Sequence, residues 1–214
     1  MSFRTGFCVS GNGSLFRAAV RRREDLRIQP ALLILETKSA SDLDDFAAAN
    51  GIASVRLDSR DRAAFDEQLT ERLIAADLHL VALTFDRILP ARAVTALSPR
   101  LINVHPALLP AFAGMRGIER TLASGVRIGG ATVHEVVEAV DAGPIIAQAA
   151  VEVMADDTPL TYGARMYSRL EPMFLQVLRW YAEGRVEHDD HGRVVIRDAR
   201  YDSLPIVPAL EHFE

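Results

Sequence analysis

Two short stretches of the chain hold an amide, an imidazole and a carboxylate: LINVHPALLP at 101–110 and VDAGP at 140–144. Asn103 supplies an amide donor, and the imidazole of His105 titrates near neutral pH. The carboxylate of Asp141 has the chemistry to orient that imidazole or to raise its pKa. An oxyanion that forms at a carbonyl needs such donors. Taken singly, His105 also suits a loop-capping residue and Asp141 an ordinary turn residue.

The local sequence predicts how these residues are presented. The apolar residues of 101–104 indicate a buried strand, and Asn103 and His105 alternate with them, so both side chains leave the strand on one side. The prolines at 106 and 110 exclude a regular helix or a central strand there. Gly143 and Pro144 indicate a tight connection that fixes Asp141 between two strands.

Other catalytic or metal-binding arrangements have less support. Ser10 or Ser14 with His105 and Asp141 would imitate a hydrolase triad, but the sequence has no G-x-S-x-G elbow. No pair of histidines has the spacing of zinc ligands together with a third ligand. The histidines considered for it are His79, His105, His134, His188 and His191, and the last two belong to a polar turn where solvated side chains are expected.

A glycine-rich loop, SGNGS at 10–14, follows the first predicted strand. Backbone N–H groups and a helix N-terminus in such a loop favour an anion such as phosphate. Gly11 and Gly13 are followed by Phe16 where a dinucleotide fingerprint has its third glycine, and no ribose-binding acid is evident, so a dinucleotide site is not expected. The glycines alone leave open a tight turn that binds no ligand.

Composition bounds the class of protein. The 214 residues are 49% hydrophobic and 25% charged, which suits one medium globular domain, with or without a small extension. A net charge of -5 argues against a nucleic-acid binder. No apolar run is long enough to cross a bilayer, and the N-terminus lacks a signal core. The single cysteine, Cys8, favours a packed thiol in a reducing cytoplasm.

Strand-like and helix-like segments alternate, which predicts an α/β fold with a parallel sheet. The predicted strands are 5–10, 30–36, 52–57, 78–85, 101–104, 127–138 and 144–153, and the last two are expected to run antiparallel to their neighbours. The predicted helices are 14–24, 41–50, 62–76, 118–125 and 158–183. Pro172 is expected to bend or interrupt the last helix. The tail after 187 predicts a turn at DDHG and a short strand at RVVIR.

The motifs together carry a resemblance. SGNGS, LINVHPALLPAFAG and GGATVHEVVEAVDAGPIIAQ resemble the formyltransferases that use 10-formyltetrahydrofolate, over about residues 5–187. The resemblance implies a Rossmann-like formyltransferase fold, with a mostly parallel central sheet and flanking helices. It implies a catalytic domain at 1–187 and a C-terminal extension at 188–214 that packs on the same domain. A cytoplasmic enzyme of one-carbon metabolism, monomeric or homodimeric, is the corresponding expectation.

The resemblance also implies roles for particular residues. Asn103, His105 and Asp141 stand where the family has its catalytic set, and the reaction is direct attack of an amine on the formyl carbon, without a metal. The loop residues implied for a substrate phosphate are Gly11, Asn12, Gly13, Ser14 and Leu15. Those implied for the folate donor, 10-formyltetrahydrofolate, are Arg62, Asp86, Arg87, Ile88, Leu89 and His134. Arg62 is equally a solvent-facing helix residue, and Ile88 and Leu89 are equally core residues.

The resemblance also implies an acceptor for the formyl group, less directly than it implies the folate donor. The expected acceptor is a phosphorylated small molecule with a primary amine, first glycinamide ribonucleotide of purine biosynthesis. Leu15 and Leu170 replace side chains that bond ligand in the family, and Asp86 replaces an apolar residue. These changes motivate the alternatives of an amino sugar or a modified ornithine as acceptor. Use of water as acceptor, by a formyltetrahydrofolate deformylase, is the alternative from another class.

Overall fold

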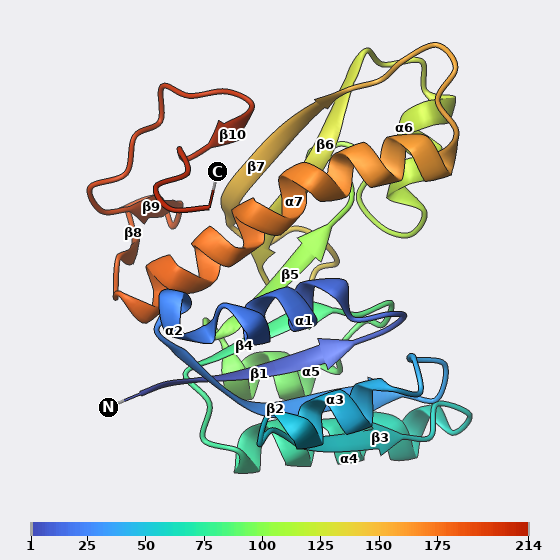
Figure 1. The fold of residues 1–214 in the computed structure, drawn as a ribbon, viewed down its shortest axis with the longest axis vertical. Coiled ribbons are helices and arrows are strands. Elements are labelled where there is room, and N and C mark those ends of the chain that lie inside the picture. The colour runs from blue at the N-terminus through green and yellow to red at the C-terminus, as the bar shows by residue number, and fades with distance from the viewer. Residues whose placement is uncertain (1, 214) are drawn as a thin grey trace. The chain divides into compact units, whose positions relative to one another are not determined.

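The protein is represented by a computed structural model that describes residues 2–213, in two compact units. Unit 1 extends to Asn103 and unit 2 begins at Val104. In Figure 1 the chain of unit 1 runs from blue to green and that of unit 2 from green to red. Residues 1 and 214, the outer ends of the predicted segments 1–187 and 188–214, lie outside the described residues, and that division stays a prediction.

Unit 1 is built on a sheet in which each strand pairs in parallel with its neighbour, in the order β5-β4-β1-β2-β3. Its strands are β1 (Phe3–Val9), β2 (Ile28–Glu36), β3 (Ala53–Leu57), β4 (Leu80–Thr84) and β5 (Leu101–His105), which continues into unit 2. The chain leaves β1 for β2 and β3 on one side and returns to β4 and β5 on the other. In Rossmann-like folds ligands bind outside the carboxyl ends of the strands where this change of direction occurs, and here it occurs between β1 and β4.

The central strands of unit 1 are buried on both faces, as parallel sheets covered by helices require. Phe7, Cys8, Val9 and 33–35 are at most 1% exposed. The packed thiol predicted for Cys8 is confirmed, and burial raises the pKa of that thiol above its ordinary range. The thiol therefore packs as a small apolar group.

The helices of unit 1 are α1 (Ser14–Arg21), α2 (Arg23–Leu26), α3 (Leu43–Ala49), α4 (Arg62–Ala75) and α5 (Ala91–Leu97). Asp61 sets the start of α4 because its carboxylate accepts a hydrogen bond from the Ala64 N–H at 3.1 Å. The predicted helix 14–24 is instead broken at Arg22. Helix α5 was not predicted, because its seven alanine-rich residues give no clear period.

Unit 2 is antiparallel, as predicted for its first two strands. β6 (Ile128–Glu135) pairs with β7 (Ile145–Glu152), β7 pairs with β10 (Ile206–Val207), and β8 (Val186–His188) pairs with β9 (Val194–Ile196). The helices are α6 (Gly117–Ala123) and α7 (Pro159–Ala182), and α7 packs against β6 and β7. With the parallel strands of unit 1, the predicted α/β class with a mostly parallel sheet and flanking helices is confirmed.

The long helix α7 begins with a capping box and does not stop at Pro172. Thr158 and Thr161 exchange hydrogen bonds between side chain and backbone, which satisfies two N–H groups at the helix start. Of the bend or interruption predicted at Pro172, the interruption is wrong, because the helix continues to Ala182. A proline inside a helix costs about 3 kcal/mol. The buried run 173–178 that follows offsets this cost, since each large apolar side chain contributes about 1.5–3 kcal/mol.

The C-terminal segment is tied to the rest of unit 2. β10 pairs with β7, and the backbone N–H groups of Glu211 and His212 donate to the Gln176 side chain on α7 at 3.0 and 3.1 Å. The turn predicted at DDHG is present, with the Gly192 N–H donating to the Asp189 carbonyl. Within residues 2–213, no helix has an apolar stretch that would reach across a bilayer.

The close contact between β6 and β7 leads to a prediction about Gly130. A Cβ at Gly130 would lie 1.9 Å from the Ala149 carbonyl oxygen, and the residue has a φ of 154°. Relief of that overlap requires the two strands to separate, so we expect Gly130→Ala to lower the free energy of unfolding by more than about 3 kcal/mol. Urea unfolding measures this loss.

Gly125→Ala is the matched control, because a Cβ there meets nothing within 4 Å although the φ is +74°. Only the backbone penalty of about 1–2 kcal/mol applies to it. Equal losses in the two variants would contradict the proposed strand contact.

Candidate active site

β5 delivers His105 at its last position, as predicted, and Asn103 two residues before it. Asn103 pairs with Leu83 of β4 and belongs to unit 1, whereas His105 belongs to unit 2 and is 4% exposed. Strand alternation gives both side chains the same side of β5. Ala107, just beyond Pro106, is fully buried and fixes the start of the following loop.

The imidazole of His105 lies between two hydrogen-bond acceptors. Its Nδ1 is 3.2 Å from Asp141 Oδ2, and its Nε2 is 3.0 Å from the Phe112 carbonyl oxygen. A carboxylate and a carbonyl only accept, so the ring satisfies both when both nitrogens carry protons. The ring is therefore placed to act as a hydrogen-bond donor through Nε2 while Asp141 holds Nδ1.

Asp141 is the centre of the cluster in unit 2. Its backbone has a φ of 52°, a left-handed conformation that aspartate tolerates better than most residues. Oδ2 also accepts a hydrogen bond from the Gly114 N–H at 2.7 Å, and Oδ1 lies 3.6 Å from His134 Nε2. The structure thus brings together three of the predicted site residues, His105, His134 and Asp141.

His134 is almost fully buried, and its ring is held by a hydrogen bond to the backbone of the next residue. It is 2% exposed, and its Nδ1 lies 2.8 Å from the Glu135 carbonyl oxygen. Burial is the main reason that the pKa of His134 falls below its ordinary value, although the Glu135 carbonyl and Asp141 act in the opposite direction. Because the carbonyl can only accept, Nδ1 of the neutral ring carries the proton.

The glycine-rich loop of unit 1 adopts the backbone that its glycines permit. Gly11 and Gly13 have φ values of 80° and 67°, and the Ser14 N–H donates to the Asn12 side chain at 3.1 Å. The loop leads into α1, where backbone N–H groups favour an anion. Leu15 is only 4% exposed, so its side chain packs in the core, and this position offers a ligand at most its backbone.

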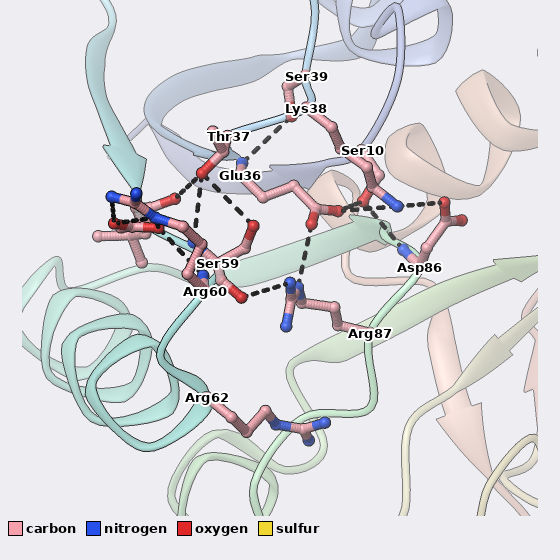
Figure 2. Close-up of polar contacts among 12 residues, drawn as sticks. Ser10, Glu36, Thr37, Lys38, Ser39, Ser59, Arg60, Arg62, Asp86 and Arg87 are labelled. Carbon is pink, nitrogen blue, oxygen red and sulfur yellow. Dashed lines mark hydrogen bonds and ion pairs between the residues drawn. The ribbon is translucent and has the colours of Figure 1, made fainter.

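An acid does stand at the end of β2, contrary to the sequence-based expectation. Glu36 follows the glycine-rich loop by about 20 residues, the spacing of a ribose-binding acid. Figure 2 shows its carboxylate already bonded to protein donors. Ser10 Oγ donates to it, Arg87 Nε lies at 3.1 Å and Lys38 Nζ at 3.6 Å, and its side chain is 1% exposed. It is therefore a structural anchor, and a dinucleotide site remains unsupported.

The predicted donor segment 86–89 is held by this anchor. The Asp86 N–H donates to Ser10 Oγ at 3.0 Å, and the Asp86 carboxylate pairs with Lys38 at 3.1 Å, a bond that raises the pKa of Lys38. The Arg87 side chain donates to Glu36 and, at 3.3 Å, to the Ser59 carbonyl (Figure 2). Its guanidinium also lies 4.5 Å above the Phe65 ring. The Arg87 side chain therefore makes hydrogen bonds within the protein, to Glu36 and Ser59.

The remaining predicted residues of the segment differ in exposure. Ile88 is 57% exposed, and its carbonyl accepts a hydrogen bond from Arg62 Nη2 at 3.1 Å. Leu89 is 7% exposed and belongs to the core. Arg62 pairs with Asp66 one turn along α4 and lies outside the Glu36 network in Figure 2. Ile88 and Arg62 therefore remain accessible to a ligand.

Comparison with known proteins identifies relatives of this chain. The Formyl transferase family matches residues 4–178. Phosphoribosylglycinamide formyltransferase of Bacillus subtilis (strain 168) is 34% identical over 177 residues, which cover 80% of this chain and 90% of the relative.

Two solved structures are similar along nearly the whole chain. Phosphoribosylglycinamide formyltransferase from Anaplasma phagocytophilum has a TM-score of 0.83 at 30% identity, and the match covers 92% of this chain and 95% of that one. Glycinamide ribonucleotide transformylase 1 from Symbiobacterium toebii has a TM-score of 0.81 at 34% identity, with 91% and 93% covered.

The Glu36 anchor leads to a prediction about stability. Glu36→Ala leaves Arg87 without its carboxylate partner in a largely buried setting, so we expect the free energy of unfolding in urea to fall by about 3 kcal/mol. Glu36→Gln keeps the volume and one acceptor and should lose less. Asp58→Ala breaks only the exposed pair with Arg60 and should change little. Unchanged stability of Glu36→Ala would contradict the anchor.

The pKa of His134 leads to a prediction about pH. Between the lowered pKa of the folded chain and the ordinary value of about 6.5, the unfolded chain binds more protons. The stability that neutral His134 contributes is therefore present above pH 6.5 and is lost as the pH falls below it. Urea unfolding at pH 7.5, 6.5 and 5.5 should show that the wild type loses stability relative to His134→Gln. A constant difference across this range would refute the burial effect.

Proposed function

Because the chain belongs to the formyl transferase family of enzymes, we propose that it transfers the formyl group of 10-formyltetrahydrofolate to the amine of glycinamide ribonucleotide, in purine biosynthesis. The single observation that carries this proposal is the contact of Asp141 with Nδ1 of His105 at the end of β5. The relative from Bacillus subtilis named for this activity supports the choice of acceptor.

The donor set of unit 2 fits formyl transfer. When bound, 10-formyltetrahydrofolate supplies a formyl carbon whose oxygen gains negative charge as an amine attacks. His105 donates to that oxygen from Nε2, in place of the Phe112 carbonyl that now accepts this hydrogen bond. Asp141 holds Nδ1 and so fixes the orientation of the ring. Asn103 adds its amide from the same side of β5.

The proton balance also suits these residues. The attacking amine forms the new C–N bond and loses a proton, and the folate nitrogen that leaves takes up a proton. Asp141 accepts the first proton, directly or through water, and lies 3.6 Å from the unprotonated Nε2 of His134. These groups hold or move the proton within one buried cluster, and no covalent bond to the protein is required.

Unit 1 supplies the proposed binding segments. The loop 11–15 would receive the acceptor's phosphate through backbone N–H groups at the start of α1. Arg62, Ile88 and the backbone of 86–89 would meet the folate, with Arg87 and Leu89 supporting that segment from within. Leu15 and Leu170 are 4% and 1% exposed, so both are core residues, and the acceptor contacts fall to neighbours such as the exposed Glu171.

The first test of the function is turnover of 10-formyltetrahydrofolate followed by absorbance, with and without glycinamide ribonucleotide. We expect turnover only with the ribonucleotide. Since a positioned acid or an oxyanion donor contributes about 100- to 10,000-fold, His105→Ala should lower kcat by at least about 100-fold. Asp141→Asn should lower it similarly, because an amide cannot accept the proton that the attacking amine loses.

His191→Ala is the matched control, since His191 is exposed in the turn between β8 and β9. Formate release without an amine would replace the proposal by a deformylase activity. Folate binding with no transfer to glycinamide ribonucleotide, but transfer to an amino sugar or ornithine derivative, would replace the acceptor. Full activity of His105→Ala would refute the mechanism.

A further inference from the structure

A second carboxylate is buried directly behind His134. Glu135 is the last residue of β6 and is 5% exposed. The Tyr181 hydroxyl of α7 donates to its Oε1 at 2.9 Å, and His188 Nε2 of β8 lies 2.9 Å from its Oε2. His188 was expected to be solvated, but it makes this contact with its side chain 37% exposed. Three elements of unit 2 thus converge on one side chain.

This contact fixes the position of Glu135. A buried carboxylate is stable only when donors replace its water, so it draws α7 and β8 toward the end of β6. Burial, and then the charge of Glu135, raise the pKa of Tyr181 well above its ordinary range, so its hydroxyl remains a donor. Each carboxylate oxygen has its own partner, and the side chain has one favourable orientation.

The backbone of Glu135 contacts both the connection that carries Asp141 and the ring of His134. Its N–H donates to the Pro144 carbonyl at 2.9 Å, and its carbonyl accepts from His134 Nδ1 at 2.8 Å. A Cβ at Gly143 would lie 1.8 Å from that carbonyl oxygen, so the connection that carries Asp141 packs flush against it. Displacement of Glu135 would therefore move both His134 and the Asp141 connection.

The orientation of His134 has a chemical consequence. With the proton on Nδ1, the neutral ring turns the lone pair of Nε2 toward Asp141 Oδ1, 3.6 Å away. A base that faces a carboxylate gives a proton received by Asp141 a second acceptor. The other tautomer would place an N–H there and would remove this acceptor.

We propose that Glu135 is a positioning residue for formyl transfer: Tyr181 and His188 hold its carboxylate, and its carbonyl keeps His134 in the Nδ1–H tautomer that faces Asp141. The kinetic part of this inference rests on the proposed function. It also gives the start of the C-terminal extension a role, because His188 is its first residue.

Kinetics of four variants test the proposal, with purified full-length chain and saturating 10-formyltetrahydrofolate and glycinamide ribonucleotide. His188→Ala and Tyr181→Phe each remove one partner and should lower kcat by about tenfold, the lower end of the loss that follows removal of an outer partner of a metal-bound histidine. The KM of either substrate should change less than twofold. Glu135→Ala should lose more, and Glu135→Gln, which keeps an acceptor for Tyr181, should recover part of the loss.

His191→Ala is again the matched control, because it removes the same side chain from the same hairpin outside this contact. Melting temperatures identify any variant that fails to fold, and His188→Ala, at the most exposed of the three positions, keeps the test decisive. Equal loss of kcat in His191→Ala would overturn the proposal, as would a proportional rise in KM with kcat unchanged.

Imidazole ¹⁵N NMR gives a readout that does not need turnover. The wild type should show His134 with its proton on Nδ1, assigned by the loss of that signal in His134→Gln, and Glu135→Ala or His188→Ala should show a mixture of tautomers. An unchanged tautomer together with unchanged kcat overturns the inference. Loss of the tautomer in a protein whose wild type transfers no formyl group would refute the proposed function and leave the positioning of His134 standing.

Discussion

A carboxylate removed from water must be surrounded by donors, and the candidate site of this chain depends on how Asp141 meets that constraint. Its Oδ2 has two such donors, Nδ1 of His105 and the Gly114 N–H, and its Oδ1 lies 3.6 Å from Nε2 of the His134 ring. These groups come from β5, from the loop after it and from β6, so the carboxylate fixes three segments at once. The same contacts determine that His105 presents a donor and that His134 presents a base.

The left-handed conformation of Asp141 belongs to this arrangement. Positive φ values also occur at Phe112, Gly114 and Arg116 in the loop whose carbonyl and N–H face His105 and Asp141. Such conformations cost of order 1–3 kcal/mol for residues other than glycine and persist where the surroundings enforce them. Here the enforcing contacts are the hydrogen bonds to the imidazole and the carboxylate, so the strain is concentrated where the geometry matters.

Buried carboxylates organise the rest of the molecule in a similar way. In unit 1, Glu36 collects Ser10, Lys38 and Arg87 from the ends of β1, β2 and β4, and so fixes the loops at the carboxyl edge of the parallel sheet. In unit 2, Glu135 collects Tyr181 and His188 from α7 and β8. Each carboxylate makes hydrogen bonds, which are directional, where an apolar side chain would make only packing contacts. The loop or ring next to it is therefore restricted to one geometry.

The sequence by itself determined the fold class, most of the elements and the residue types of the candidate site. The alternation of strands and helices, the polar residues that alternate along β5, and the glycines of the first loop are local patterns, and they correctly predicted an α/β fold with His105 at a strand end. They erred where a local rule was outweighed by burial, as at Pro172, or where the pattern was ambiguous, as in α5. The tertiary structure alone decided that Glu36 is an internal anchor, that Arg87 faces inward, that the Phe112 carbonyl and the Gly114 N–H complete the His105–Asp141 pair, and that Glu135 holds His134. These contacts join residues far apart in the chain, and they depend on strand register and on which side chains lose their water, neither of which a short stretch of sequence encodes.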